Sequence, residues 1–372
     1  MNKDLWKKAD WIFMGITMML VTVGFILTFS SGKGMEGNLP MKTGVYIAIG
    51  IVAMLAMASV DYNKYKEIEK PIYLFMILIL LLVLAFGVEF YGAKNWIFIG
   101  PFSIQPSEFS KILFVLAFGS YLTRHYENDD SWKSVLTAFA YAAPPLLLIL
   151  MEPDMGTALV YVAMIFGMLY ASTLNKKYIT ILLLGSVGLF IAWLALHLTI
   201  GLPIPLAEYQ IQRFTVFLDP YNDGKNGLGA GYNIIQALIA VGSGGLGGKG
   251  FQNGTQVNML PVKESDFIFS VVGEEFGFIG SVGLLLIFFL FLLKALVIAH
   301  ECLDHYGFVV IMGFLSMFLF HILENVGMNL SVMPVTGIPL PFISAAGSNL
   351  MANFMAVGII LNISMQRTKA IF

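Results

Sequence analysis

The sequence predicts an all-α polytopic membrane protein with about ten transmembrane helices and a long extracytoplasmic segment between spans seven and eight. Of its 372 residues, 58% are hydrophobic and only 12% are charged, whereas about 25% of an average soluble domain is charged. The apolar residues gather in runs that approach the ~20 residues a helix needs to cross a bilayer. Lysine and arginine are concentrated in alternate connections between these runs, as expected for a membrane protein of fixed orientation.

Hydropathy places the expected spans between residues 11 and 364. The first run follows Lys7 and Lys8 like a signal peptide, but it is long and lacks a clear A-x-A cleavage site, so we expect it to remain as an anchor. We treat residues 1–372 as a single integral membrane domain. The expected spans are about 11–30, 44–60, 71–88, 107–123, 136–150, 155–173, 178–197, 267–297, 307–325 and 345–364.

The basic residues predict the orientation. With a cytoplasmic N-terminus, the inner connections hold ten lysines and arginines and the short outer connections hold three. This asymmetry follows the positive-inside rule, and an even number of spans returns the C-terminus to the cytoplasm. The inner set is Lys64, Lys66, Lys70, Arg124, Lys133, Lys176, Lys177, Lys294, Arg367 and Lys369, and the outer set is Lys33, Lys42 and Lys94.

The connection 198–266 is far longer than a typical loop, and we expect function there. Its stretch 231–250 joins a short apolar helix pattern to a glycine cluster, which is typical of an interfacial or re-entrant piece. Nine glycines between Gly227 and Gly250 lower the barrier to backbone rearrangement. We therefore expect this segment to be the mobile part that admits a substrate.

Eight charged residues from five separate places fall on the outer side, at the ends of expected spans, in a short outer hairpin or in the long outer segment. Charges are unfavourable in a membrane protein unless they pair or line a cavity, so the pattern predicts one polar site near the outer leaflet. Asp266 stands out because it opens a span directly after the polar run PVKES, where partial dehydration would raise its pKa and suit a general base. The eight residues are Glu108, Lys111, Glu152, Asp154, Arg213, Lys263, Asp266 and Glu324.

Several of these residues also have a purely structural interpretation. Glu108 and Lys111 are three positions apart on one helix face and can neutralise each other. Glu152 and Asp154 can cap the helix that follows them, and Asp266 can be an N-cap. Of Glu274 and Glu275 in the eighth span, we expect at least one to be structural. These alternatives stay open from the sequence alone.

Other functional classes are excluded. The net charge of -2 gives no basic surface for nucleic acid, and one cysteine, Cys302, cannot form a disulfide framework. The run GSGGLG at 242–247 fits G-x-G-x-x-G but follows no strand and lies in an outer segment, so it does not indicate a dinucleotide site. Five scattered histidines give no metal-binding spacing, and we expect them in inner loops or interfaces.

Eight strings resemble, in order along the chain, motifs of the SEDS family of bacterial cell-wall polymerases (shape, elongation, division and sporulation). GGKGFQNGTQ at 247–256 is similar to the elongation members. The chain departs from the family pattern at Asn95, at Ser265 and at Ala345–Asn349. The strings are GAKNWIFIG (92–100), QPSEFSKI (105–112), EPDMGTALV (152–160), QRFTVFLDP (212–220), GAGYNIIQALIAVGSGGLGGKG (229–250), ESDFIFSVVGEEFG (264–277), ENVGMNLSVMPVTGIPLPFIS (324–344) and GSNLMANFMAVGI (347–359).

The resemblance implies a multi-pass protein of the bacterial cytoplasmic membrane that joins lipid II units into glycan strands on the outer face during elongation and rod-shape maintenance. For this inverting reaction we assign Asp266 as the general base for the acceptor hydroxyl. We assign Lys111, Arg213 and Lys263 to the pyrophosphate. Glu108, Glu152 and Asp154 would orient these cations or bind sugar and peptide, and Trp96 would stack on a sugar.

The resemblance further implies two kinds of partner: a class B penicillin-binding protein that crosslinks the product, and other membrane proteins of the elongation complex. The sequence requires no cofactor, although a divalent cation bridging pyrophosphate and carboxylates is compatible with it. A lipid II flippase is the alternative function, and a recruiting scaffold is a third. A flippase needs polar residues along both halves of a path, whereas these charges lie at the outer ends.

Overall fold

Each expected span lies on a helix of the structure, a computed structural model that describes residues 6–34, 38–90, 93–100, 102–125, 131–203, 208–223 and 225–366. The predicted all-α class is therefore confirmed. Arg367 and Lys369, used above for orientation, lie outside the described residues. The ten helices are α2 (Trp11–Ser31), α3 (Leu39–Ser59), α5 (Glu69–Phe86), α6 (Pro106–His125), α7 (Trp132–Met151), α8 (Met155–Ala171), α9 (Lys176–Ile200), α12 (Ile268–His300), α13 (His305–Asn329) and α14 (Gly347–Gln366).

In the described part of the chain, eight helices are long and apolar enough to cross a membrane, judged by length and composition. The other two expected spans are α6, which carries Glu108, Lys111 and Arg124, and α8, which has only 17 residues. Both lie inside the bundle, where α6 packs against α5, α13 and α14, and α8 packs against α13. A helix surrounded by other helices needs fewer lipid-compatible side chains, which explains the charged residues of α6.

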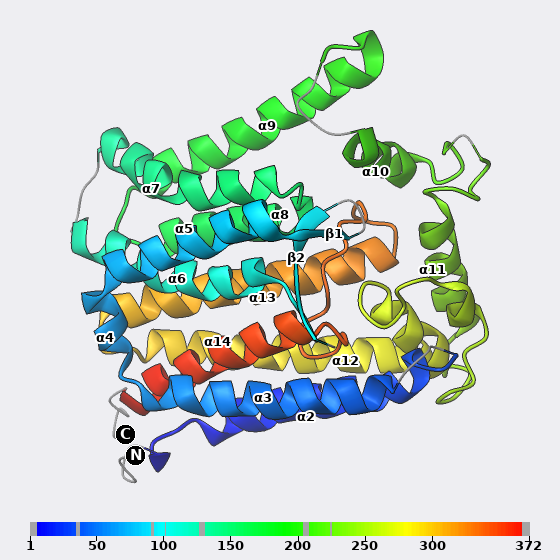
Figure 1. Ribbon diagram of the computed structural model, residues 1–372, viewed down its shortest axis with the longest axis horizontal. Coiled ribbons are helices and arrows are strands. Elements are labelled where there is room, and N and C mark those ends of the chain that lie inside the picture. The colour runs from blue at the N-terminus through cyan, green and yellow to red at the C-terminus, as the bar shows by residue number, and fades with distance from the viewer. Residues whose placement is uncertain are drawn as a thin grey trace.

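The long helices lie side by side, with α13 and α14 inside the bundle and α9 at its edge (Figure 1). In their most apolar stretches, 89% of α14 is buried but only 6% of α9. Polar side chains start several helices: Asp10, Asn38, Asp154 and Asp304 each accept a backbone N–H of the first turn, which satisfies a donor that has no partner within the helix.

One end of the bundle carries the remaining elements except α4 (Tyr62–Glu67), and we call it the loop end (Figure 1). It includes α10 (Glu208–Leu218), α11 (Tyr232–Ser243) and the 3₁₀ turn η1 (Gln256–Met259), all in the long segment. It also includes an antiparallel sheet in the order β1-β2-β3, which the sequence analysis did not anticipate. The strands are β1 (Val88–Phe90), β2 (Ala93–Ile99) and β3 (Phe102–Ile104).

The glycine cluster after α11 is bonded to α12, contrary to the expectation that it moves freely. Four backbone hydrogen bonds of 2.9–3.1 Å join residues 245–250 to residues 274–279, where α12 is broken at Gly277. A Cβ on Gly244 would lie 2.0 Å from the carbonyl oxygen of Gly273. These glycines therefore permit close backbone contact, and the expectation of mobility is corrected for this part of the segment.

Candidate active site

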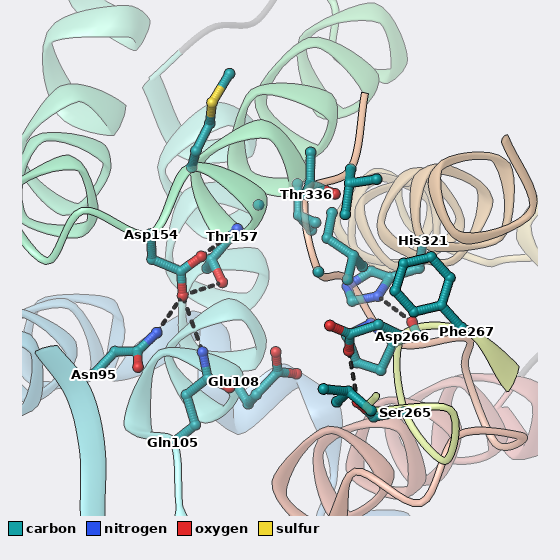
Figure 2. A pocket seen from close by; sticks show the side chains of 18 of the residues that line it. Asn95, Gln105, Glu108, Asp154, Thr157, Ser265, Asp266, Phe267, His321 and Thr336 are labelled. Atoms are coloured by element: carbon teal, nitrogen blue, oxygen red, sulfur yellow. Dashed lines mark hydrogen bonds between the residues drawn. The ribbon is translucent and has the colours of Figure 1, made fainter. Parts of the chain in front are cut away.

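A cavity of about 590 Å³ opens at the loop end and is lined by side chains from distant parts of the sequence. Figure 2 shows Asp154 and Glu108 on one side of it and Asp266 and His321 on the other. Its lining includes Trp96, Glu108, Asp154, Arg213 and Asp266. From the sequence, eight residues were assigned a catalytic or substrate-binding role, and these five of them are thus brought together.

Asp266 lies in a tight turn just before α12. The carbonyl oxygen of Val262 accepts the N–H groups of Ser265 and Asp266 at 3.2 and 3.1 Å. Val262 has a φ of 57°, which is an outlier for a β-branched residue, and such strain gathers at functional sites. The N-cap of α12 is Phe267, which makes no side-chain capping hydrogen bond. The interpretation of Asp266 as an N-cap is therefore wrong.

The Asp266 carboxyl group faces the cavity, where its Oδ1 accepts a hydrogen bond from Ser265 Oγ at 2.6 Å. Burial raises the pKa of Asp266, while the Ser265 hydrogen bond and the charge of Arg213 oppose that rise. A carboxylate that is partly dehydrated is a stronger base than one in water. The geometry is therefore compatible with the role that the sequence suggested.

Arg213 reaches the cavity from α10 and contacts its opposite wall, formed by residues 335–339 and called the wall segment below. Its Nη1 donates to the carbonyl oxygen of Thr336 at 3.1 Å. A second cavity, of about 240 Å³, shares Arg213, Asn233 and Val335 with the first. Arg213 thus lines two neighbouring cavities at the loop end.

The wall segment passes close to Asp266 at Gly337. Gly337 has a φ of 78°, and a Cβ placed there would lie 3.3 Å from Asp266 Oδ2. Only glycine combines this left-handed conformation with so close an approach. The side chain of Asn325 joins the two segments, donating to the carbonyl oxygens of Ile338 at 2.8 Å and Asp266 at 2.9 Å. Asp266 and the wall segment are consequently held by one side chain.

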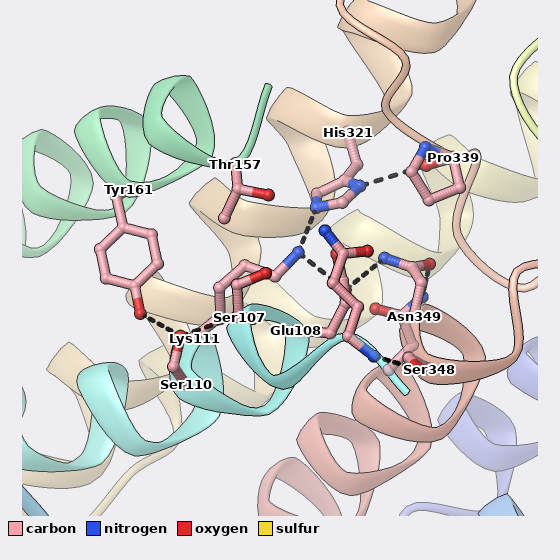
Figure 3. A network of polar contacts seen from close by, with 12 residues as sticks. Ser107, Glu108, Ser110, Lys111, Thr157, Tyr161, His321, Pro339, Ser348 and Asn349 are labelled. Atoms are coloured by element: carbon pink, nitrogen blue, oxygen red, sulfur yellow. Dashed lines mark hydrogen bonds and ion pairs between the residues drawn. The ribbon is translucent and has the colours of Figure 1, made fainter. Parts of the chain in front are cut away.

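Lys111 does not reach the cavity. Its Nζ lies 2.8 Å from Glu108 Oε2 and 3.0 Å from His321 Nε2, and its side chain is only 1% exposed. Glu108 also accepts a hydrogen bond from Asn349 Nδ2 at 2.8 Å (Figure 3). The predicted pairing of Glu108 with Lys111 is confirmed. The structure does not bring Lys111 to a position where it could contact a ligand directly.

Lys263 also points away from the cavity. Its Nζ donates to the carbonyl oxygen of Lys33 at 3.2 Å and to Asn258 Oδ1 at 2.9 Å. Glu274 is structural, as expected for one of the pair, because it accepts the backbone N–H groups of residues 255–257. Of the three cations assigned to pyrophosphate from the sequence, the structure places Arg213 alone at the cavity.

Asp154 and Glu152 have different roles although they are two residues apart. Asp154 caps α8, accepting the backbone N–H of Thr157 at 2.9 Å, and it lines the cavity. It also accepts hydrogen bonds from Asn95 at 2.7 Å and Gln105 at 3.0 Å. Glu152 is fully buried, does not line the cavity, and has no hydrogen-bond partner for either carboxylate oxygen among the described residues. The capping interpretation is confirmed for Asp154 and is wrong for Glu152.

The unpartnered carboxyl of Glu152 predicts a pH-dependent stability. Burial, with help from the charge of Asp154, raises the pKa of Glu152 from 4.5 to about 8. The folded state binds a proton that the unfolded state releases, so stability falls as pH rises from 4.5 to 8. At pH 7 this loss amounts to about 3 kcal/mol, at about 1.4 kcal/mol per pKa unit.

Glu152→Gln should therefore raise the unfolding temperature at pH 8 and change it little at pH 4.5, while activity stays within about twofold. Thermal unfolding of the detergent-solubilised protein at the two pH values checks this. Equal shifts at both pH values, or a lower unfolding temperature at pH 8, would show that Glu152 is charged and partnered in the folded protein.

A family model for FtsW, RodA and SpoVE, described as a cell cycle protein, matches residues 8–369. The chain belongs to this family. Stage V sporulation protein E of Bacillus subtilis is 34% identical over 366 residues, which cover 95% of this chain and 96% of that protein. Peptidoglycan glycosyltransferase RodA of Treponema pallidum is 31% identical, with 96% and 98% of the two chains covered.

The fold of this FtsW/RodA/SpoVE member also matches a solved chain from work on the structural coordination of polymerization and crosslinking by a peptidoglycan synthase complex. The TM-score is 0.79 at 29% sequence identity, and the match covers 96% of this chain and 97% of that one. The family membership expected from the eight motif strings is thus confirmed. The motifs EPDMGTALV and ESDFIFSVVGEEFG each supply one aspartate of the cavity.

Sequence reasoning missed the polar side chains that hold the site of this family member in place. His321, Asn325 and Asn329 occupy one face of α13 at intervals of four residues, and all three are buried. His321 was expected in an inner loop or interface, but it lines the cavity. The i, i+4, i+8 spacing of polar residues within an apolar span was the signal that could have found them.

A divalent cation at the site is compatible with the sequence. In the described ranges, no group of three or more histidine, cysteine, aspartate and glutamate side chains is arranged to hold a metal ion. Of the four carboxylates that line the cavity, Glu108, Asp154 and Asp266 hold separate hydrogen-bond partners, and Glu264 is the fourth.

Proposed function

We propose that this chain is a peptidoglycan glycosyltransferase that polymerises lipid II into glycan strands during cell elongation and rod-shape maintenance. The observation that carries the proposal is one cavity holding a partly dehydrated carboxyl group, Asp266, together with an arginine, Arg213. Relatives named as peptidoglycan glycosyltransferases support the same activity.

In the proposed reaction, Asp266 accepts the proton of the acceptor GlcNAc 4-hydroxyl as that oxygen attacks the anomeric carbon of the donor MurNAc. The new glycosidic bond forms while the bond from that carbon to the pyrophosphate oxygen breaks, with inversion. Undecaprenyl pyrophosphate leaves with the bonding electron pair. The guanidinium of Arg213 can hold this anion through two parallel hydrogen bonds.

The remaining side chains of the cavity are proposed to bind and orient the substrate. Trp96 offers an aromatic face for a sugar ring, and Glu108 and Asp154 offer acceptors for sugar hydroxyls or the stem peptide. Lys111 and Lys263 do not contact the substrate in this scheme. The ammonium group of Lys111 pairs with Glu108, and that of Lys263 donates to Asn258. Glu152, which does not line the cavity, has no role in this scheme.

Orientation and assembly complete the proposal. The positive-inside pattern supports cytoplasmic N- and C-termini in a bacterial cytoplasmic membrane, with the loop end and the segment 198–266 on the outer face of a single domain. A related chain comes from a complex that coordinates polymerization and crosslinking. We infer a class B penicillin-binding protein as the partner of this chain, together with other membrane proteins of the elongation complex.

Labelled lipid II supplied to the purified protein and its penicillin-binding partner in detergent micelles tests this function. Micelles have no sidedness, so a polymerase still makes glycan and releases undecaprenyl pyrophosphate, whereas a flippase has no product to make. If no glycan forms in micelles and the protein transfers labelled lipid II between the leaflets of vesicles, the glycosyltransferase function is rejected in favour of a lipid II transporter.

If Arg213 binds the pyrophosphate through two hydrogen bonds, a positive charge at this position is not sufficient for full activity. Arg213→Lys keeps the positive charge but loses the planar fork that binds two oxygens, so we expect most activity to be lost, by about tenfold or more. The rate of glycan formation at saturating lipid II measures this. Full activity in the lysine variant would reduce Arg213 to a general electrostatic contact.

A further inference from the structure

A ladder of buried polar side chains on α13 holds the backbone around the cavity. Asn329 Nδ2 donates to the carbonyl oxygen of Asp266 at 3.0 Å, which is also held by Asn325. Four residues from Asn325, His321 Nδ1 lies 3.1 Å from the carbonyl oxygen of Pro339 in the wall segment. The same face of one helix thus fixes the backbone of Asp266 and the wall segment that passes beside it.

His321 differs from the two asparagines because it also contacts a charge. Its Nε2 lies 3.0 Å from the ammonium of Lys111, which is paired with Glu108 (Figure 3). His321 is 1% exposed and lines the cavity together with Glu108 of this ion pair. It therefore connects α6 to the wall segment through its two ring nitrogens.

The two neighbours of His321 determine where its proton lies. An ammonium group only donates hydrogen bonds, so Nε2 must present its lone pair to Lys111. A carbonyl oxygen only accepts, so Nδ1 must carry the hydrogen that points to Pro339. A second proton on Nε2 would place two cations 3.0 Å apart with no solvent between them. Both contacts together require the neutral imidazole with its proton on Nδ1.

We propose that His321 is a positioning residue for the polymerase site, whose neutral imidazole ties the Glu108–Lys111 pair to the wall segment and so sets the wall against Asp266. This inference rests on the proposed function. Because Asn325 bonds both the wall segment and the backbone of Asp266, a shift of the wall is transmitted to the base. A displacement of about 1 Å at a reacting group can lower a rate by about 10²-fold.

His321→Leu removes both ring hydrogen bonds, and we expect kcat to fall about 10- to 100-fold with KM changed less than about threefold. His321→Gln keeps one acceptor and one donor on a neutral group, and we expect it to restore kcat to within about fivefold of wild type. Glycan formation from lipid II, with kcat and KM measured separately, reads this out. A leucine variant with wild-type kcat, or a glutamine variant as slow as leucine, overturns the proposal.

Asn362→Leu is the matched control for simple destabilisation. Asn362 on α14 is also buried and bonds two backbone groups, Tyr62 N at 2.9 Å and Ala58 O at 2.7 Å, at the opposite end of the bundle. We expect it to lower the unfolding temperature while kcat per folded molecule stays unchanged. Equal losses of kcat in Asn362→Leu and His321→Leu would make His321 an ordinary buried residue and reject the proposal.

The tautomer can be tested without activity. In ¹⁵N spectra of histidine-labelled protein, the signals that disappear in His321→Gln should be those of a neutral ring with its proton on Nδ1. A proton on Nε2, or a doubly protonated ring, overturns the proposal even if the enzyme works. Wild-type protein that makes no glycan refutes the proposed function separately, and the spectra still decide the geometry of His321.

Discussion

Asp266→Asn should abolish glycan polymerisation almost completely while leaving the protein folded and able to bind its partner. The amide keeps the shape of the carboxyl group and can still contact Ser265, but it cannot accept the acceptor's proton. A positioned general base contributes about 10² to 10⁴ in rate, so only trace activity should remain. Initial rates with labelled lipid II, compared at equal amounts of folded protein, measure the loss.

Glu264→Gln provides the control for charge at the same place. Glu264 also lines the cavity, two residues before Asp266, and burial raises its pKa as well. If Asp266 alone is the base, the Glu264 variant should retain most activity. Equal losses in both variants would point to a shared electrostatic effect, and wild-type rates in Asp266→Asn would remove Asp266 from the base role.

The same assignment predicts the acid side of the pH profile. The base must be ionised to accept a proton, so kcat/KM should fall as pH decreases through the pKa of Asp266. Because burial raises that pKa above the usual aspartate value, the fall should begin at a higher pH than an exposed aspartate would give. The residual rate of Asp266→Asn should not show this acid limb.

The helices were predictable because an apolar run in lipid must satisfy its own backbone hydrogen bonds, and a helix does so within one segment. Even α6 was predictable for this reason, although its Glu108 and Lys111 make it less apolar than its neighbours. The sheet β1-β2-β3 was missed because its pairing joins short segments outside the spans. Strand pairing depends on which segments meet, and hydropathy does not report that.

For the site, the sequence predicted which residues gather but not which way each side chain points. Asp266, Asp154 and Arg213 all reach the cavity, as their placement on the outer side suggested. Lys111 and Lys263 turn toward buried or backbone acceptors instead. The direction of a long side chain depends on partners such as His321 and Asn258 that lie far away in sequence.

The amides and hydroxyls around these charges were harder to foresee. Asn95 and Asn349, both at positions where the chain departs from the family pattern, bond Asp154 and Glu108 respectively. Asn325 and Asn329 have no net charge to attract notice, yet they hold the backbone of Asp266. Their role depends on backbone carbonyls that become neighbours only when α13 packs beside the turn before α12.

Lys111→Met should be the most destabilising single change considered for this site. It leaves the Glu108 carboxylate buried, with Asn349 as its remaining hydrogen-bond partner. Breaking a buried ion pair by removing one partner typically destabilises a protein by about 3–5 kcal/mol, because the remaining charge is uncompensated. Folded yield and the unfolding temperature in detergent should both drop.

Neutralising both members should recover that stability, since a buried pair replaced by uncharged groups of similar volume is often as stable as the original. Glu108→Gln with Lys111→Met should therefore unfold near the wild-type temperature. Exchanging the charges, Glu108→Lys with Lys111→Glu, should not recover it. Asn349 then donates toward a lysine that has no acceptor, and His321 loses the donor for its Nε2.

Activity separates the two interpretations of the pair that the sequence left open. In the neutral double variant the protein is folded, but position 111 no longer donates to His321, so the side chain that bonds the wall segment at Pro339 loses its contact with α6. A buried positive charge near the cavity is lost as well. We expect stability to return while glycan synthesis stays at least about tenfold below wild type, in line with the sensitivity of rate to small displacements. Full recovery of synthesis along with stability would show that Glu108 and Lys111 serve only the fold.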